Sequence, residues 1–163
     1  MYERSMHKKF IALLSSLFIF IGCSSTKPYP NVGSKNLHVV TSDRAEGILE
    51  RFGTDLHIYK INRDCTEEYL GSIDLKANPN TPIGLPQNEF IALKVEFSFS
   101  HINTSGSTIA QRILMPNSKY SYKLEVERAN SISNVELFEI HPRNGTKKEI
   151  YIPSLPQCNQ NMQ

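Results

Sequence analysis

Strict alternation of apolar and polar residues constrains the fold of this chain more than any other feature. In residues 91–101, every second residue is apolar: Leu93, Val95, Phe97 and Phe99. The same holds in residues 119–128 for Tyr120, Tyr122, Leu124 and Val126. A period of two places one set of side chains on each face of a strand, so both stretches predict strands with one buried face.

Shorter apolar runs recur about every ten residues along the rest of the chain, a spacing typical of sandwiches. They are residues 37–41, 56–62, 69–75, 109–115, 133–141 and 149–152. Residues 44–52 form either a helix or a strand, because Gly47 weakens the helical pattern. We therefore predict an all-β fold, an antiparallel β-sandwich of immunoglobulin-like or transthyretin-like type with about seven or eight strands and at most one short helix. A lipocalin-type barrel is the alternative, but it would need longer and more regular strands.

Two local features refine this prediction near the C-terminus. In residues 133–141, the apolar positions shift from Val135 and Leu137 to Phe138 and Ile140. A β-bulge, or a strand buried on both faces, would account for the shift. Asn144 and Gly145 then stand between apolar runs, which is a strong signal for a tight hairpin.

The beginning of the chain is typical of an export signal. His7, Lys8 and Lys9 precede an uninterrupted apolar run, residues 10–22 (FIALLSSLFIFIG). This run is shorter than the roughly 20 helical residues that span a bilayer, but it suits the apolar region of a signal peptide. A buried N-terminal helix is the alternative, although such a helix would show polar positions at the helical period.

The apolar run ends in Gly22 and Cys23, and this ending resembles the lipobox of bacterial lipoproteins. Phe20 departs from the pattern, in which Leu, Val or Ile is commoner at that position. The resemblance implies cleavage before Cys23 and attachment of lipid to its thiol and its new amino group. Because Ser24 follows, it also implies sorting to the outer membrane, on the periplasmic face. Several acyl chains together form a stable anchor.

The chain therefore divides into three parts: a signal peptide over residues 1–22, the lipidated Cys23 with a flexible tether over residues 23–36, and a β-sandwich domain over residues 37–163. The tether is predicted from its Ser, Pro, Asn and Gly content. Met6 is an alternative start to Met1, since Glu3 stands ahead of the basic residues. The chain has 18 Lys and Arg residues, of which three lie in the signal peptide, and 16 Asp and Glu residues, of which one lies there. The mature chain therefore has no net charge. Nucleic acid is not an expected partner.

Cys65 and Cys158 remain once Cys23 is lipidated. The periplasm is oxidising, and two thiols in an exported domain predict a structural disulfide. Closing so long a loop would stabilise the fold by about 4–5 kcal/mol and would hold the C-terminus in place. A metal or redox site is the alternative, but neither cysteine has a CxxC motif or a nearby histidine.

Catalytic signatures are not recognisable in the sequence. The motifs GxGxxG, P-loop, GxSxG and HExxH are absent. The mature histidines are scattered over predicted strands or their ends: His38, His57, His101 and His141. Glu125 and Glu127 share the polar face of a predicted strand, so they are interpreted as solvated carboxylates and not as an acid–base pair. We expect no catalytic residue, metal site or cofactor.

Residues 77–88 (ANPNTPIGLPQN) form the most distinctive predicted loop, because three prolines surround Ile83, Gly84 and Leu85. Prolines lower the entropy cost of ordering a loop, so Ile83 and Leu85 could be presented to a partner. The favoured interpretation is that the two side chains instead plug the end of the sandwich beneath the loop.

These features favour a non-catalytic lipoprotein that is held at the outer membrane and binds another component of the cell envelope. A small-ligand-binding or inhibitor-like lipoprotein, with a pocket between its sheets, is one alternative. A second alternative is an accessory role in a type VI secretion system. It is implied by residues 56–61 (LHIYKI), which resemble a strand of the sandwich lipoprotein of such systems. An enzyme of unrecognised type is the third.

Overall fold

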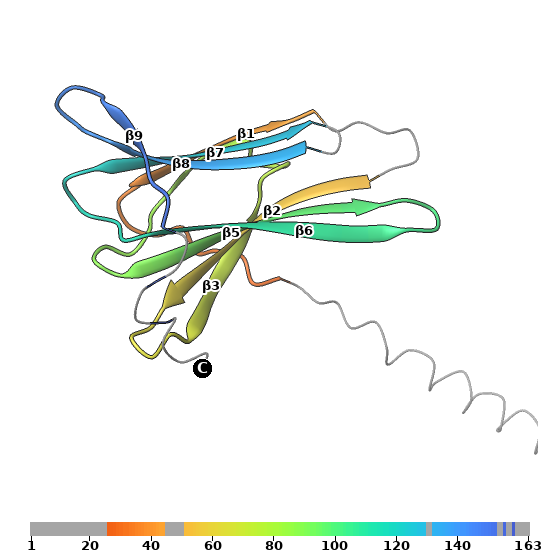
Figure 1. Ribbon diagram of the computed structural model, residues 1–163, viewed down its shortest axis with the longest axis horizontal. Coiled ribbons are helices and arrows are strands. Elements are labelled where there is room, and N and C mark those ends of the chain that lie inside the picture. The colour runs from red at the N-terminus through yellow and green to blue at the C-terminus, as the bar shows by residue number, and fades with distance from the viewer. Residues whose placement is uncertain (1–25, 45–50, 130–131, 153–154, 156–157, 159–163) are drawn as a thin grey trace, which may run out of the picture.

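The computed structural model describes residues 26–44, 51–129, 132–152, 155 and 158, and these residues form a β-sandwich without an α-helix (Figure 1). The predicted all-β sandwich is confirmed. The strands in these residues are β1 (Leu37–Asp43), β2 (Arg51–Ile61), β3 (Glu67–Asp74), β4 (Asn80–Ile83), β5 (Phe90–Ser100), β6 (Ser105–Leu114), β7 (Ser121–Ala129), β8 (Ile132–Ile140) and β9 (Lys147–Glu149).

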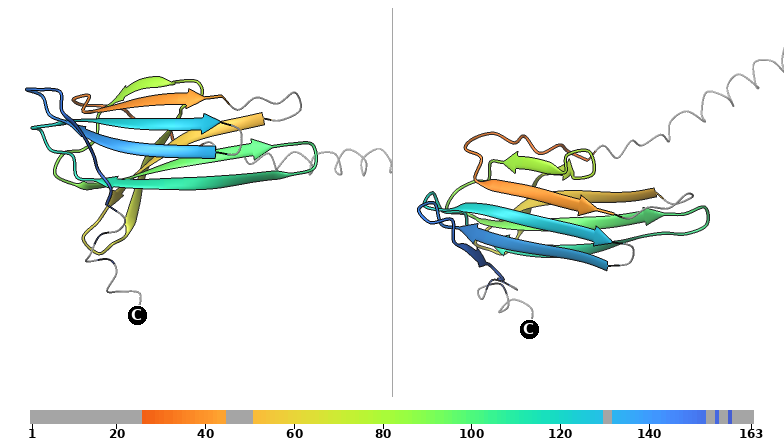
Figure 2. Two further views of the ribbon diagram at one scale, coloured as in Figure 1. Left: turned by 45° about the horizontal axis from the view of Figure 1, so that its top comes forward. Right: turned by 90° about the horizontal axis from the view of Figure 1, so that it is seen from above.

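The strands form two facing sheets (Figures 1 and 2). The five-stranded sheet has the order β4-β1-β7-β8-β9, and the four-stranded sheet has the order β3-β2-β5-β6. Strands β1 and β7 pair in parallel, and the other pairs are antiparallel. An immunoglobulin-like sandwich keeps its first two strands in one sheet, whereas β1 and β2 lie in different sheets here. The strand order therefore differs from that of the immunoglobulin-like type.

The core between the sheets is built from the alternating strands. Leu93, Val95 and Phe97 of β5 are buried, and so are Tyr122, Leu124 and Val126 of β7. The same cluster includes Leu56 and Ile58 of the central strand β2. Burying an aliphatic side chain of this size contributes about 1.5–3 kcal/mol, so the alternating strands make a large contribution to the driving force for folding.

One prediction was left open and another differs from the structure. Of residues 44–52, positions 45–50 lie outside the described residues, while Arg51 and Phe52 begin β2, as the strand alternative predicts for these two positions. Strand β4 lies within the proline-framed segment that was predicted as a loop. Pro82 is tolerated in β4 because this strand is at the edge of its sheet, where a missing amide breaks no ladder.

The shift of apolar positions in β8 does not come from a bulge. Strand β8 pairs with β7 in unbroken register from Ile132 to Ile140. Phe138 and Ile140 are half-buried, and the Lys147 ammonium lies 3.5 Å from the centroid of the Phe138 ring. The hairpin predicted at Asn144 and Gly145 connects β8 to β9. A register shift occurs instead between β2 and β3, beside Ile58 and Tyr59.

Residues 27–36, which we call the strap, lie against the sandwich, although their composition predicts a flexible tether. The Tyr29 amide donates to Ser72 O at 2.9 Å, and the Ser72 amide donates to Lys27 O at the same distance. The Tyr29 hydroxyl donates to Gly84 O at 2.6 Å. The Asn36 side chain accepts from the Leu85 amide at 2.7 Å. The strap therefore covers the β3 edge of one sheet and the segment that follows β4.

Candidate binding surface

Exposed apolar side chains gather on the side of the sandwich opposite the strap. Among the described residues, seven large apolar side chains are exposed: Val32, Phe99, Ile102, Ile109, Met115, Ile132 and Tyr151. Val32 belongs to the strap. Phe99 and Ile102 belong to the β5–β6 hairpin, Ile109 is in β6, and Met115 directly follows that strand. Ile132 begins β8, and Tyr151 is in the segment after β9. We call the surface formed by β6, residues 132–137 of β8 and residues 150–152 the open side.

Both sheets end on the open side. Strand β6 is the last strand of the four-stranded sheet. In the other sheet, β9 pairs with residues 138–140 of β8, and the Ile150 amide donates to Leu137 O, so the strand before Leu137 has no neighbouring strand on that side among the described residues. Within the described residues, no further strand pairs with β6 or with the first half of β8. The strap, in contrast, covers the opposite edges.

Arg112 connects the two edges of the open side. Its side chain is on the inward face of β6, opposite Leu93, and one of its amino groups donates to the carbonyl of Val135 in β8. The guanidinium carbon also lies 5.6 Å from the centroid of the Tyr151 ring. Because the side chain binds a backbone carbonyl and an aromatic ring at once, it holds β6, β8 and the crossing segment together.

Two of the exposed isoleucines lie at corresponding places along the open side. Strands β6 and β8 run in the same direction across the molecule (Figure 2). Ile109 and Ile132 each come three residues before the contact between Arg112 and Val135. Their exposed fractions are 58% and 71%. Ile109 is on the outer face of the four-stranded sheet, and Ile132, which pairs with Ala129, is on the outer face of the five-stranded sheet. The two side chains therefore flank the open side from opposite faces.

Shallow grooves lie at one end of the open side. One has a volume of about 430 Å³ and is lined by residues that include Leu114, Met115 and Tyr151. A neighbouring groove of about 500 Å³ shares Phe90 and Met115 with it. Such volumes fall within the range of small-molecule sites. Both grooves are on the surface, whereas the space between the sheets is filled by the core side chains.

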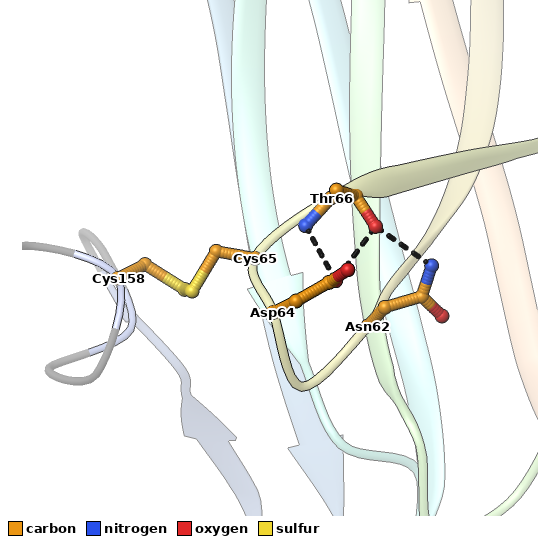
Figure 3. Close-up of a disulfide and its surroundings, with 5 residues drawn as sticks. All are labelled: Asn62, Asp64, Cys65, Thr66 and Cys158. Atoms are coloured by element: carbon orange, nitrogen blue, oxygen red, sulfur yellow. Dashed lines mark hydrogen bonds between the residues drawn. A yellow bond between two sulfur atoms is a disulfide. The ribbon is translucent and has the colours of Figure 1, made fainter. Parts of the chain in front are cut away.

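The predicted disulfide between Cys65 and Cys158 is present beside these grooves (Figure 3). The two Cα atoms are 5.5 Å apart across a sequence separation of 93 residues. Cys65 has a φ of +68° in the turn between β2 and β3. Asp64 accepts hydrogen bonds from the Thr66 hydroxyl at 2.7 Å and the Thr66 amide at 3.1 Å, and these bonds lower the pKa of Asp64. This turn therefore holds Cys65 in place.

The disulfide fastens the C-terminal segment onto the outer face of the four-stranded sheet. Leu155 is only 3% exposed and packs with Ala92 and Ile113 in a small second core. Ile152 and Cys158 lie against the same cluster. Because this segment covers the end of β6, it limits the exposed edge of that strand to the part before Ile113.

Ile83, Gly84 and Leu85 are in the interior and not at the surface. Ile83 is fully buried in β4, and Leu85 is 4% exposed. Gly84 is packed so closely beneath the strap that a Cβ atom there would lie 2.4 Å from Val32 O. The structure thus has the core plug that the sequence favoured. Neither side chain is accessible, so the alternative of a partner-binding loop at these residues is wrong.

Cys23 lies outside the described residues, so its lipidation remains a prediction. In the part of the chain that the structure describes, no helix has the length and apolar character needed to cross a membrane. The strap begins four residues after Cys23, with Lys27 O accepting the Ser72 amide.

Within the described part of the chain, the remaining titratable groups do not form a recognisable reaction centre. His57 Nε2 lies 3.2 Å from a carboxylate oxygen of Glu96 on the outer face of the four-stranded sheet. Glu125 is bound by Lys123 and Lys147, each at 2.8 Å, and their hydrogen bonds lower its pKa. A lowered pKa makes a carboxyl a poorer proton donor near neutral pH. Among the described residues, no group of three or more His, Cys, Asp and Glu side chains could hold a metal ion.

The open side was missed from the sequence, although one signal was available. No Asp, Glu, Lys or Arg occurs in residues 97–111, a stretch that spans the β5–β6 hairpin. Strand edges in monomeric proteins usually carry charges that prevent pairing with other chains, so this absence points to an interaction surface. In comparisons with known proteins, the chain matches no family model, no curated protein and no solved structure.

Proposed function

We propose that this chain is a lipoprotein anchored through Cys23 at the periplasmic face of the outer membrane, and that its non-catalytic sandwich binds another component of the cell envelope through the open side. The observation that carries this proposal is the distribution of exposed apolar side chains. Of the seven such side chains in the described residues, Ile109, Ile132 and Tyr151 belong to the open side, Phe99 and Ile102 belong to the adjoining β5–β6 hairpin, and Met115 directly follows β6. Aromatic and Met side chains are enriched at protein interfaces.

The strap supports an anchored arrangement. If Cys23 carries the lipid, only residues 24–26 separate it from the strap, whose first backbone contact is at Lys27. Four residues of extended chain reach at most about 14 Å. The anchor therefore keeps the strap side of the sandwich near the membrane surface. The open side, at the other edge of both sheets, faces away from the membrane and toward the periplasm.

The test compares exposed apolar residues on the two sides. We expect the pair Ile102→Ser and Ile109→Ser to abolish co-purification of a stoichiometric envelope partner from detergent-solubilised membranes. Val32→Ser is the matched control, because Val32 is 71% exposed on the strap and Ile102 is 72% exposed. Since all three side chains are exposed, thermal unfolding should barely change. Equal binding by both variants would refute the role of the open side, and loss of binding only with Val32→Ser would move the site to the strap.

Binding of a small molecule is a second candidate function, favoured by the two grooves beside Phe90 and Met115. Native protein that carries a bound small molecule, and no protein partner, would support it. The secretion-system alternative depends on residues 56–61, which form part of β2. Because Leu56 and Ile58 are fully buried, that likeness bears on the fold more than on a binding surface.

A further inference from the structure

The direction of the backbone groups along β6 follows from hydrogen bonds at the opposite edge of the same sheet. The Ser72 amide and carbonyl both bind the strap, so in β3 they point away from β2. In an antiparallel ladder, successive residues direct their backbone groups to alternate sides. His57 lies opposite Ser72 in β2, so its backbone groups point the other way, toward Lys94 of β5. Val95 follows Lys94 along β5, so its backbone groups point toward Ala110 of β6.

The same alternation fixes the whole of β6. Residues with even numbers, such as Thr108 and Ala110, direct their amides and carbonyls toward β5. Residues with odd numbers direct theirs away from the sheet: Ser105, Ser107, Ile109 and Gln111. Within the described residues, no backbone group pairs with these four on their outer side. The Gln111 carbonyl already accepts from Arg112 Nη1 at 2.8 Å. The edge thus offers the donors and acceptors of Ser105, Ser107 and Ile109, and the Gln111 amide.

This edge lacks the features that usually prevent strand addition. Natural edge strands carry Lys, Pro, bulges or inward-pointing charges. Strand β6 pairs with β5 without a register shift, and residues 105–111 contain no proline and no charged residue. The first inward-pointing charge is Arg112, which is bound to Val135. The open stretch therefore ends at Arg112.

We propose that β6 accepts an extended, uncharged segment of an envelope protein, which adds as a fifth strand to the four-stranded sheet. This inference rests on the proposed function and specifies how the open side binds. Main-chain hydrogen bonds to Ser105, Ser107 and Ile109, and to the amide of Gln111, supply the affinity. The Ile109 side chain, on the outer face of the sheet, selects an apolar residue opposite it.

A second copy of the chain fits this edge less well than a different protein. Pairing β6 with its own copy would join the two sheets about a two-fold axis and place the two β3 edges at opposite ends. The two straps would then face in opposite directions. The short link to Cys23 holds the strap side near the membrane, so both copies could not meet one membrane in this way. A segment that extends from a periplasmic protein has no such restriction.

The test uses proline to remove a single outward amide. A photo-crosslinking residue replaces Ile109 in the full chain in its native envelope, and the crosslinked peptide is identified by mass. In this background we compare Ser107→Pro with Ser107→Ala. Ser107 directs its amide outward, so proline leaves the ladder to β5 intact while removing one bond to the added strand. We expect crosslinking to fall about tenfold with proline and to be retained with alanine.

The remaining outcomes are decisive as well. Equal crosslinking of the proline and alanine variants would overturn strand addition. Binding would then depend on side chains on the outer face of the four-stranded sheet and not on the backbone edge of β6. A crosslink to a second copy, or to a highly charged peptide, would overturn the proposed occupant. A second crosslinker at Tyr151 separates the two proposals. Crosslinks from Tyr151 alone would leave the open side as the binding surface and refute strand addition, whereas crosslinks from neither position would refute both.

Discussion

Arg128 shows how a single residue can follow the pattern of a strand against its own chemistry. It occupies the inward position of β7 after Val126 and is only 4% exposed. Its guanidinium donates to Gly53 O at 3.0 Å and lies 4.6 Å from the centroid of the Phe52 ring and 5.9 Å from that of Phe97. Alternation alone places this residue inside, whereas its charge suggests the surface. The two rings and the carbonyl come from other strands, and Asp43 lies opposite Arg128 in β1, so the burial depends on long-range contacts.

Truncating Arg128 should therefore destabilise the fold mainly through lost packing. We expect Arg128→Ala to lower the free energy of unfolding by about 2–4 kcal/mol, because it removes the ring contacts and leaves a cavity. Arg128→Met keeps most of the volume and should lose clearly less. Urea unfolding of the two variants is the measurement. Equal losses would show that the hydrogen bond to Gly53 matters more than the packing.

Asp55 should make stability fall with rising pH. Burial raises its pKa, and the neighbouring Asp74 raises it further. The pKa in the unfolded chain is about 3.9. Below that pH, Asp55 is protonated in both states and does not lower the free energy of unfolding. The destabilisation develops as pH rises through the raised folded-state pKa. Asp55→Asn should thus be more stable than the native chain at pH 7 and equal to it at pH 3. Greater stability of the native chain at pH 7 would contradict this expectation.

Glu125 should have the opposite effect. Hydrogen bonds from Lys123 and Lys147 lower its pKa below the value of about 4.3 in the unfolded chain. Its stabilising contribution is present above that value and is lost as pH falls through the lowered pKa. Glu125→Gln should therefore weaken the fold at pH 7 but not at pH 2. A loss of stability that is the same at both values would point to packing and not to charge.

At the scale of elements, the strands could be predicted where their side chains alternate. Residues 91–101 and 119–128 are β5 and β7 in nearly these bounds. Strand β4 was not predicted, because four residues that include Pro82 show no alternation. The strap was predicted as a tether, because its contacts are long-range bonds from Tyr29 and Asn36 to backbone groups, and local composition does not encode these. For the same reason the parallel pairing of β1 with β7 could not be predicted.

Docking of the strap should depend on the absence of a side chain at Gly84. A Cβ atom there would meet Val32 O at 2.4 Å, so Gly84→Ala requires the strap to move. We expect this change to expose the strap to limited proteolysis while the core remains folded. Ser34→Ala is the control, because Ser34 is exposed and belongs to the same segment. Proteolysis of the strap at the native rate in Gly84→Ala would show that the contact is not needed for docking.

The disulfide should hold the C-terminal segment as well as stabilise the fold. Cys65→Ser should free one alkylatable thiol, at Cys158, and lower the free energy of unfolding by up to about 4–5 kcal/mol. It should also raise amide exchange at Ala92 and Ile113, since Leu155 covers them only while the segment is fastened. Replacing both cysteines with Ser should match the reduced native chain. Two free thiols in untreated protein would refute the bond.

At the scale of the whole molecule, the two sides of the sandwich are unequal, and the sequence alone does not reveal this. The strap covers the edges at β3 and β4, while β6 and the start of β8 remain open. This asymmetry needs strand order, which depends on contacts between residues far apart in the chain. In the arrangement that we propose, the covered side lies next to the anchor and the other side is left for a partner.

The orientation at the membrane can be tested by energy transfer. The measurement uses lipidated protein on vesicles, with a donor dye at Ser34 on the strap or at Ser105 on β6 and an acceptor in the lipid headgroups. Both positions are exposed. Transfer should be more efficient from Ser34, because the strap side is the one nearer to the membrane in the proposed arrangement. Three strand spacings, about 14 Å, separate β3 from β6 across the sheet. Inserting a flexible linker of about ten residues between Thr26 and Lys27 should reduce this difference, since the reach of the link then exceeds the width of the sheet. Equal transfer from both positions without the linker would show that the strap side does not face the membrane.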